Sequence, residues 1–299
     1  MKKVLYFLLL LQLTTGCLSV SKQQLSAVRQ FAVKTGNFSS FPEKIMSELA
    51  GIRETRGIYF ANSISDPELH LSELKAIVKE RLKDDRLPGR VATCFKILNE
   101  YAVGLERLSS DGPGKTVSEH YLKFGSELES LVGDYNQSGT ANKLPAGIGS
   151  ALARTLDLGT KHYLANRQLI ELKKFTSQAD TMVSVICAGM VEFLSSNGLG
   201  QLIGAEESGL TESFRFYFTR RQPSVDSEKE FVTLSKRVEE VKLLQKKSID
   251  AAKSLRLAHK KLTEMLNQRI SFEDFAVGLN SFFKEIEILD SAIIKMSKE

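Results

Sequence analysis

The longest hydrophobic pattern in the chain runs from Leu158 to Phe193. Apolar residues recur there at alternating four- and three-residue intervals, which predicts one apolar stripe along a single long helix that begins near Pro145. Such a helix cannot bury its stripe alone, so the pattern also predicts partner helices. The stripe consists of Leu158, His162, Ala165, Leu169, Leu172, Thr176, Ala179, Val183, Ile186, Met190 and Phe193.

Two more stripes follow, over residues 231–266 and 272–296. The first is interrupted by Gln245, Ser248 and His259, while the second is apolar at every heptad position. Three long stripes with short connections predict an all-α protein, folded as an elongated antiparallel helical bundle with coiled-coil-like long helices. The last stripe consists of Phe272, Phe275, Leu279, Phe282, Ile286, Leu289, Ile293 and Met296.

Helix-start signals place the shorter elements. Pro42 and Asp66 begin two helices in the N-terminal half, and Ser227 and Ser271 are candidate N-caps for the last two. A short helix is expected over residues 21–34, before a polar break at 35–40. The domain prediction is a signal peptide at 1–16, a lipidated N-terminus and tether at 17–41, and the bundle at 42–299, with a subdivision near 134–145 as an alternative.

The start of the chain has the pattern of a secretory signal. Lys2 and Lys3 precede an uninterrupted apolar run from Val4 to Leu11, which is too short to span a bilayer as a helix of about 20 residues. No acidic residue lies before Cys17. These features predict an exported protein.

The signal ends in Leu13-Thr14-Thr15-Gly16-Cys17, which resembles the lipobox of bacterial lipoproteins. Thr14 departs from the family pattern, which favours leucine at that position. The resemblance implies that Cys17 receives a diacylglyceryl group and becomes the acylated, palmitate-bearing N-terminus after cleavage. Ordinary signal-peptidase cleavage after Gly16 and an uncleaved helix are the alternatives.

The composition adds few constraints on chemistry. The 299 residues carry a net charge of +5, which is too mild to imply a nucleic-acid partner in an exported chain. Cys94 and Cys187 show no CxxC spacing, so we expect both to be buried and unpaired, with a disulfide as the alternative.

Signals for metal binding and catalysis are weak. The four histidines lie in no HExxH or CxxC…H spacing, and no local catalytic triad is indicated. We therefore expect no metal, no cofactor and no enzymatic activity. His162 and His259 fall on apolar stripes, where boundary histidines are the simpler interpretation and a shared ligand or pH-sensing pair is the alternative.

Two groups of basic residues have two interpretations each. Arg53 and Arg56 lie one turn apart, as a solvated face or a paired site, and we expect the solvated face. Residues 220–261 carry twelve Lys and Arg against six Asp and Glu. This excess gives either a solvated helix face, which we favour, or a face that holds anionic lipid headgroups or an acidic partner.

Together these features predict a lipid-anchored, extracytoplasmic bacterial lipoprotein that acts as a structural, binding or assembly component at the membrane surface. We expect it in the cell envelope, on the outer membrane in a Gram-negative cell, facing the periplasm or exterior and contacting a protein partner there. The apolar run Met182–Leu194, interrupted by Glu192, suggests an alternative: a secreted helical protein that inserts into membranes, as helical pore-forming toxins do. A periplasmic enzyme is a third alternative.

Overall fold

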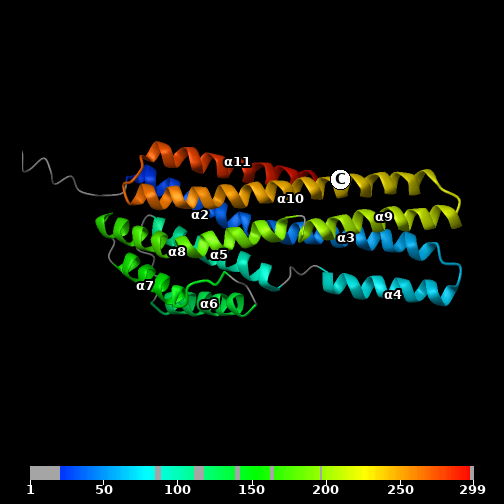
Figure 1. Cartoon of the computed structure of the whole chain (residues 1–299), viewed down its shortest axis with the longest axis horizontal. Helices are drawn as coiled ribbons and strands as arrows, with labels where there is room; N and C mark the ends of the chain where they lie inside the picture. The colour runs from blue at the N-terminus through cyan, green and yellow to red at the C-terminus, as the bar shows by residue number, and fades with distance from the viewer. Residues whose placement is uncertain are drawn as a thin grey trace, which may run out of the picture.

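The computed structural model of the chain describes residues 21–84, 89–110, 118–138, 142–161, 165–195 and 197–296. Every regular element that it describes is an α-helix, which confirms the all-α prediction. The helices lie side by side along the long axis of the molecule (Figure 1). They are α2 (Lys22–Phe38), α3 (Phe41–Asn62), α4 (Pro67–Asp84), α5 (Gly89–Ser109), α6 (Ser118–Gln137), α7 (Ile148–Lys161), α8 (Ala165–Leu194), α9 (Leu199–Arg220), α10 (Val225–Leu266) and α11 (Phe272–Met296).

Helix α10 is the longest described element and contacts most of the others. Its 42 residues span about 63 Å. It packs against α11, α8, α9, α3 and α2. Helices α8 and α9 follow one another along it, so its two halves have different neighbours (Figure 1). The apolar stripe predicted for this helix is buried at Leu234, Val238, Val241, Ala252, Leu255, Leu262 and Leu266.

The C-terminal helix α11 follows its predicted seam closely. Six of the eight seam residues are buried, and Phe272 and Ile293 are partly buried at the two ends. The predicted N-cap is also present, because the Ser271 hydroxyl accepts a hydrogen bond from the Asp274 backbone N–H at 3.1 Å. Asp66 caps α4 in the same way, through the backbone N–H groups of Glu68 and Leu69. For α10, the N-cap is Ser224 and not Ser227, which occupies position N3 of that capping box.

The prediction of one continuous helix from Pro145 to Phe193 is wrong. Helix α7 ends at Lys161, α8 begins at Ala165, and the two pack against each other. The Thr155 hydroxyl of α7 accordingly lies 3.2 Å from the Gln178 Oε1 of α8. The stripe continues within α8, where its residues from Leu169 to Met190 are buried. The apolar stripe appeared continuous in the sequence because the alternating four- and three-residue spacing continues from α7 into α8.

The segment predicted as a tether, residues 17–41, contains a helix of the bundle. Helix α2 begins with a capping box between Ser21 and Gln24 and packs against α5, α11 and α10. It runs to Phe38, through part of the expected polar break. Val28, Phe31 and Phe38 are fully buried, so the packed part of the chain begins well before Pro42.

The stretch near 134–145 connects two helices that pack on each other. Helix α6 continues to Gln137 and contacts α7. Asn136 of α6 donates a hydrogen bond to the Leu144 carbonyl at 3.0 Å and accepts one from its N–H at 2.7 Å. Glu129 accepts hydrogen bonds from the N–H groups of Gly147 and Gly149. These contacts hold the described part of this connection against α6.

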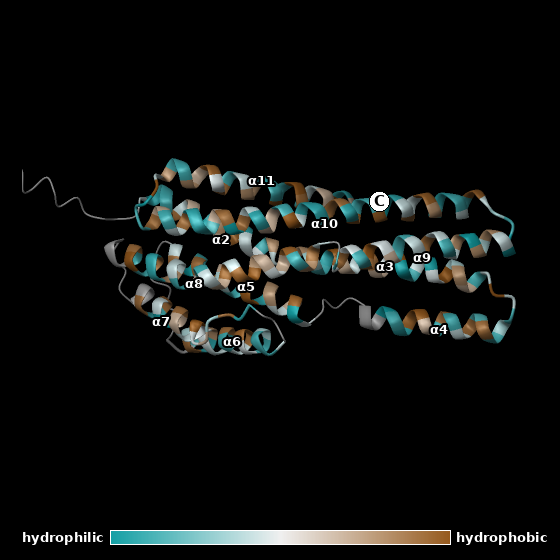
Figure 2. Ribbon diagram, viewed as in Figure 1, coloured by the Kyte–Doolittle hydropathy of each residue, from teal (hydrophilic) through white to brown (hydrophobic). Residues whose placement is uncertain are grey.

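Helix α4 is the outlying element of the fold. It packs on α3, and none of its residues whose burial is described falls in the buried class. Leu69, Leu71 and Val78 are between 45% and 65% exposed. Hydrophobic residues therefore appear on α4 as well as in the packed layers (Figure 2).

Truncation of two adjacent phenylalanines tests the packing of α11. Phe282 is fully buried and contacts the rings of Phe31 and Phe38, whereas Phe283 is only partly buried. Phe282→Ala should therefore lower the free energy of unfolding by about 3–5 kcal/mol, and Phe283→Ala by clearly less. Urea melts with unchanged slopes would give both values. Equal losses would mean that α11 is buried on more than one face.

Candidate functional site

Cys17, the predicted lipidation residue, lies outside the described residues. The structure does locate the point at which the chain enters the bundle. Ser21 caps α2, and the Gln24 amide of its first turn lies 3.5 Å from the Met265 sulfur near the end of α10. The chain therefore enters at the end of the molecule where α10 turns into α11 (Figure 1).

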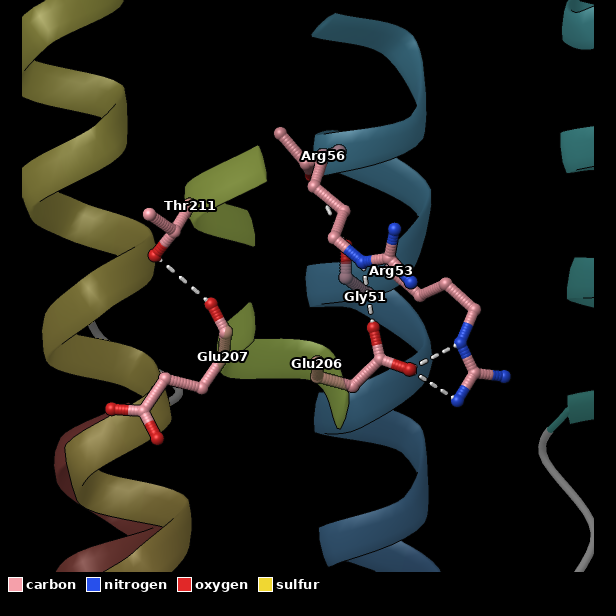
Figure 3. A network of polar contacts seen from close by, with 7 residues as sticks. Gly51, Arg53, Arg56, Glu206, Glu207 and Thr211 are labelled. Atoms are coloured by element: carbon pink, nitrogen blue, oxygen red, sulfur yellow. Dashed lines mark hydrogen bonds and ion pairs between the residues drawn. The ribbon is translucent and has the colours of Figure 1, made fainter. Parts of the chain in front are cut away.

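Two arginines of α3 hold one buried carboxylate of α9 (Figure 3). Arg53 Nε donates to Glu206 Oε1 at 2.5 Å, and Arg56 Nε donates to Oε2 of the same carboxylate at 2.8 Å. The Glu206 side chain is only 3% exposed, while the two arginine side chains are 30% and 23% exposed. We call these three residues the arginine clamp.

The clamp corrects the expectation that Arg53 and Arg56 form a solvated face. Each carboxylate oxygen of Glu206 already has a charged donor, an arrangement suited to joining helices rather than to proton transfer. Gly209 of α9 makes room for it, since a Cβ there would lie 2.7 Å from the Arg56 guanidinium carbon. The one-turn spacing of the arginines was visible in the sequence, but the partner lies 150 residues away.

His259 of α10 pairs with Asp180 of α8 at the edge of the core. Its Nδ1 lies 3.2 Å from Asp180 Oδ1, and its side chain is only 1% exposed. The hydrogen bond from His259 holds the pKa of the Asp180 carboxyl below its ordinary value. On the inner side, the His259 ring meets the Tyr101 ring edge-on, with centroids 5.4 Å apart. Burial raises the pKa of the Tyr101 hydroxyl well above its ordinary value.

The alternative in which His162 and His259 form a shared site is left untested, because the side chain of His162 lies outside the described residues. Among the residues that the structure describes, no group of three His, Cys, Asp or Glu side chains could hold a metal ion. His259 is placed as a buried member of the α10 stripe, with a carboxylate as its polar partner.

A cavity of about 370 Å³ opens beside this pair, between α8 and α10. Its charged lining is mainly basic and comes from the C-terminal half of α10. The sequence showed the basic excess of residues 220–261, but not which of its side chains would share a cavity. The lining residues include Lys253, Arg256 and Lys260 from α10, and Asp180, Val183 and Ser184 from α8. We call this feature the basic cavity.

Cys94 and Cys187 are both buried and free, as predicted. Burial raises the pKa of the Cys94 thiol to about 11 and that of the Cys187 thiol to about 12. Because the thiolate is the nucleophile, neither side chain is suited to nucleophilic catalysis at neutral pH.

One described stretch, Gln168–Arg220, is long and apolar enough to cross a membrane by length and composition alone. It covers α8 and α9 and includes the run Met182–Leu194. Within that run, Val183, Ile186 and Met190 are buried against the rest of the bundle. Insertion into a bilayer would require these side chains to leave the core.

Neutralising Glu206 tests the arginine clamp. Glu206→Gln removes the charge that two guanidiniums share at a buried position, and should lower the free energy of unfolding by about 2–4 kcal/mol. The control is Glu207→Gln, which breaks only the exposed pair with Lys242 and should cost less than about 1 kcal/mol. Urea denaturation of both variants checks this, and equal small losses would contradict it.

Thiol labelling tests the burial of the two cysteines. In the native protein at about pH 8, Cys94 and Cys187 should not react with a thiol reagent, because their raised pKa values leave little thiolate. After denaturation without reductant, both should react. The Cys94→Ser and Cys187→Ser variants assign the two signals. A denatured chain without free thiols at these positions would show a disulfide instead.

The three arrangements differ in their access to solvent. The arginine clamp and the His259–Asp180 pair join helices, whereas the basic cavity presents charged groups to solvent. No protein-family model, curated protein sequence or solved structure matches this chain. Its function is therefore inferred from its own residues.

Proposed function

We propose that this chain is a lipid-anchored, extracytoplasmic bacterial lipoprotein that acts as a structural, binding or assembly component at the membrane surface. One observation carries the proposal. The lipobox-like segment ends at Cys17, and Ser21, only four residues later, caps the first described helix of the bundle. An acyl chain on Cys17 would therefore hold the whole bundle close to the lipid headgroups.

The proposed form of this component is an elongated antiparallel bundle with coiled-coil-like packing between its long helices. Support comes from the buried heptad seam of α11 and from the packing of α11 on α10 across the short turn between them. A rigid bundle anchored at one end suits a component that holds a protein partner at a fixed distance from the membrane. The corresponding location is the cell envelope, on the periplasmic or exterior side.

A structural role also fits the state of the buried reactive groups. Glu206 is held by two arginines, His259 is held by Asp180, and the pKa of each buried thiol is raised. An acid, base or nucleophile with such partners contributes to helix packing and is poorly placed to meet a substrate. These contacts favour a binding or assembly component over an enzyme.

A membrane-inserting protein is the second candidate, favoured by the apolar stretch Gln168–Arg220. The two proposals predict different results when the mature protein is added to dye-loaded liposomes. An anchored component should leave dye-loaded liposomes intact at every concentration tested. Concentration-dependent dye release by the mature protein would favour insertion, with α8 as the segment to substitute next.

Substitution of the acylated residue tests the anchor. Cys17→Ser should abolish both fatty-acid labelling and membrane association, because stable anchoring requires at least two acyl chains and the two described cysteines, Cys94 and Cys187, are buried. The thermal melt should not change, since Cys17 precedes the first packed helix. Metabolic labelling with palmitate and cell fractionation measure both effects.

The matched control is Cys94→Ser, which removes a buried thiol and should keep full labelling. Equal labelling of the wild-type chain and Cys17→Ser would overturn the lipobox interpretation.

A further inference from the structure

The basic cavity gathers cations that the fold does not need. Lys253, Arg256 and Lys260 occupy one face of α10, at spacings of three and four residues. Like charges at these spacings repel one another and destabilise a helix. All three side chains are exposed, so they are not required to fill the core. Their gathering around one cavity therefore suits a ligand of opposite charge.

Little in the described part of the chain neutralises these cations. Lys253 and Arg256 form no ion pair or hydrogen bond there, and Lys260 has Glu264 at 4.0 Å, the outer limit of an ion pair. The acidic residue of the lining is Asp180, which already accepts a hydrogen bond from the buried His259. Three cations thus face one carboxylate that has a partner of its own.

The lining is also suited to a phosphate group attached to an apolar body. Lysine and arginine bind phosphate oxygens, and Ser184 adds a hydroxyl donor on the α8 side. Leu257 lies beside the cations and is 49% exposed, and it supplies the accessible apolar part of the lining, because Val183 is buried. A ligand with both an anionic oxygen group and a hydrocarbon portion would match both parts of the lining.

The cavity lies near the end of the molecule that the anchor would hold. Lys260 is six residues, or about 9 Å, from the end of α10 at Leu266. The first turn of α2 contacts α10 at that same end, through Gln24 and Met265. Between Cys17 and Ser21 the chain can extend by at most about 14 Å. Lipid headgroups around the anchor would therefore be within reach of the cavity.

We propose that the basic cavity binds the phosphate group of an anionic phospholipid in the membrane that holds Cys17. The assignment of the lipid source rests on the proposed function, while the phosphate chemistry does not. Binding would give the bundle a second contact with the membrane and fix which of its sides faces the lipid. A soluble phosphate monoester shares the same headgroup chemistry and is the other source to be distinguished.

The test uses the Cys17→Ser chain, which has no acyl group, so failure of the anchor cannot be confused with failure of the cavity. Cosedimentation is measured with vesicles of phosphatidylcholine, with and without a quarter of phosphatidylglycerol. The cavity variant is Lys253→Gln with Arg256→Gln and Lys260→Gln. The charge-matched control is Lys229→Gln with Lys236→Gln and Lys246→Gln, three exposed lysines of α10 outside the cavity.

Binding to the phosphatidylglycerol vesicles should fall by about tenfold or more in the cavity variant and change less than about twofold in the control. Unchanged thermal melts establish that both variants fold. Equal losses in the two variants would overturn the proposal in favour of diffuse attraction along α10. Equal binding to both kinds of vesicle, or no binding to either, would also overturn it.

Two further titrations distinguish the sources of the anion. Glycerol phosphate should displace the chain from the anionic vesicles, and direct titration in solution should show weaker binding of glycerol phosphate by the cavity variant. If the chain binds glycerol phosphate tightly but does not bind vesicles, the assignment of a lipid as the ligand is overturned and the phosphate site is kept. If the chain binds polyglutamate but neither vesicles nor glycerol phosphate, the partner is an acidic protein, and the phosphate assignment is overturned.

Discussion

An apolar stripe that runs the length of a 42-residue helix must be covered along that whole length, and this constraint on α10 organises the described fold. Helix α11 covers part of it, and α8 and α9 cover it in series from another side. Two of the three polar interruptions of the stripe have partners in this arrangement, while the hydroxyl of the buried Ser248 has none among the described residues. Gln245 donates a hydrogen bond to the Leu194 carbonyl at the end of α8, at 2.7 Å, and His259 pairs with Asp180. Gln245 and His259 thus lie where a neighbouring helix ends or carries a charge.

The arginine clamp also fixes how α3 and α9 are aligned along their length. Hydrophobic contacts between α3 and α9 would tolerate a displacement of one helix along the other, since apolar attraction has no direction. Arg53 and Arg56 converge on the two oxygens of one carboxylate, so a displacement by one helical turn would separate at least one of the two guanidiniums from the buried Glu206. Removing one member of a buried charge group is strongly destabilising. The clamp therefore selects one alignment of the two helices.

The sequence predicted those features that depend on nearby residues. The seam of α11 and the caps at Asp66 and Ser271 follow from spacing within a few turns, and all were found. The boundary between α7 and α8 was missed because heptad positions continue from one helix to the next, so periodicity carried no sign of the break. The contact of α2 with α10 and the partner of Arg53 and Arg56 depend on residues more than 100 positions away, which a single sequence does not bring together. Cys17, the predicted lipidation site, lies outside the described residues and stays a prediction.

The contact between Gln24 and Met265 joins residues 241 positions apart, and it has a consequence for the order of assembly. A chain that is made or exported from its N-terminus presents α2 long before the α10–α11 hairpin exists. Until then, the buried face of α2, with Val28 and Phe31, has only part of its final cover. Contacts this distant in sequence close slowly, because the intervening chain must first be ordered. The start of α2 therefore completes its packing late in folding, and α2 must not aggregate before the α10–α11 hairpin has formed.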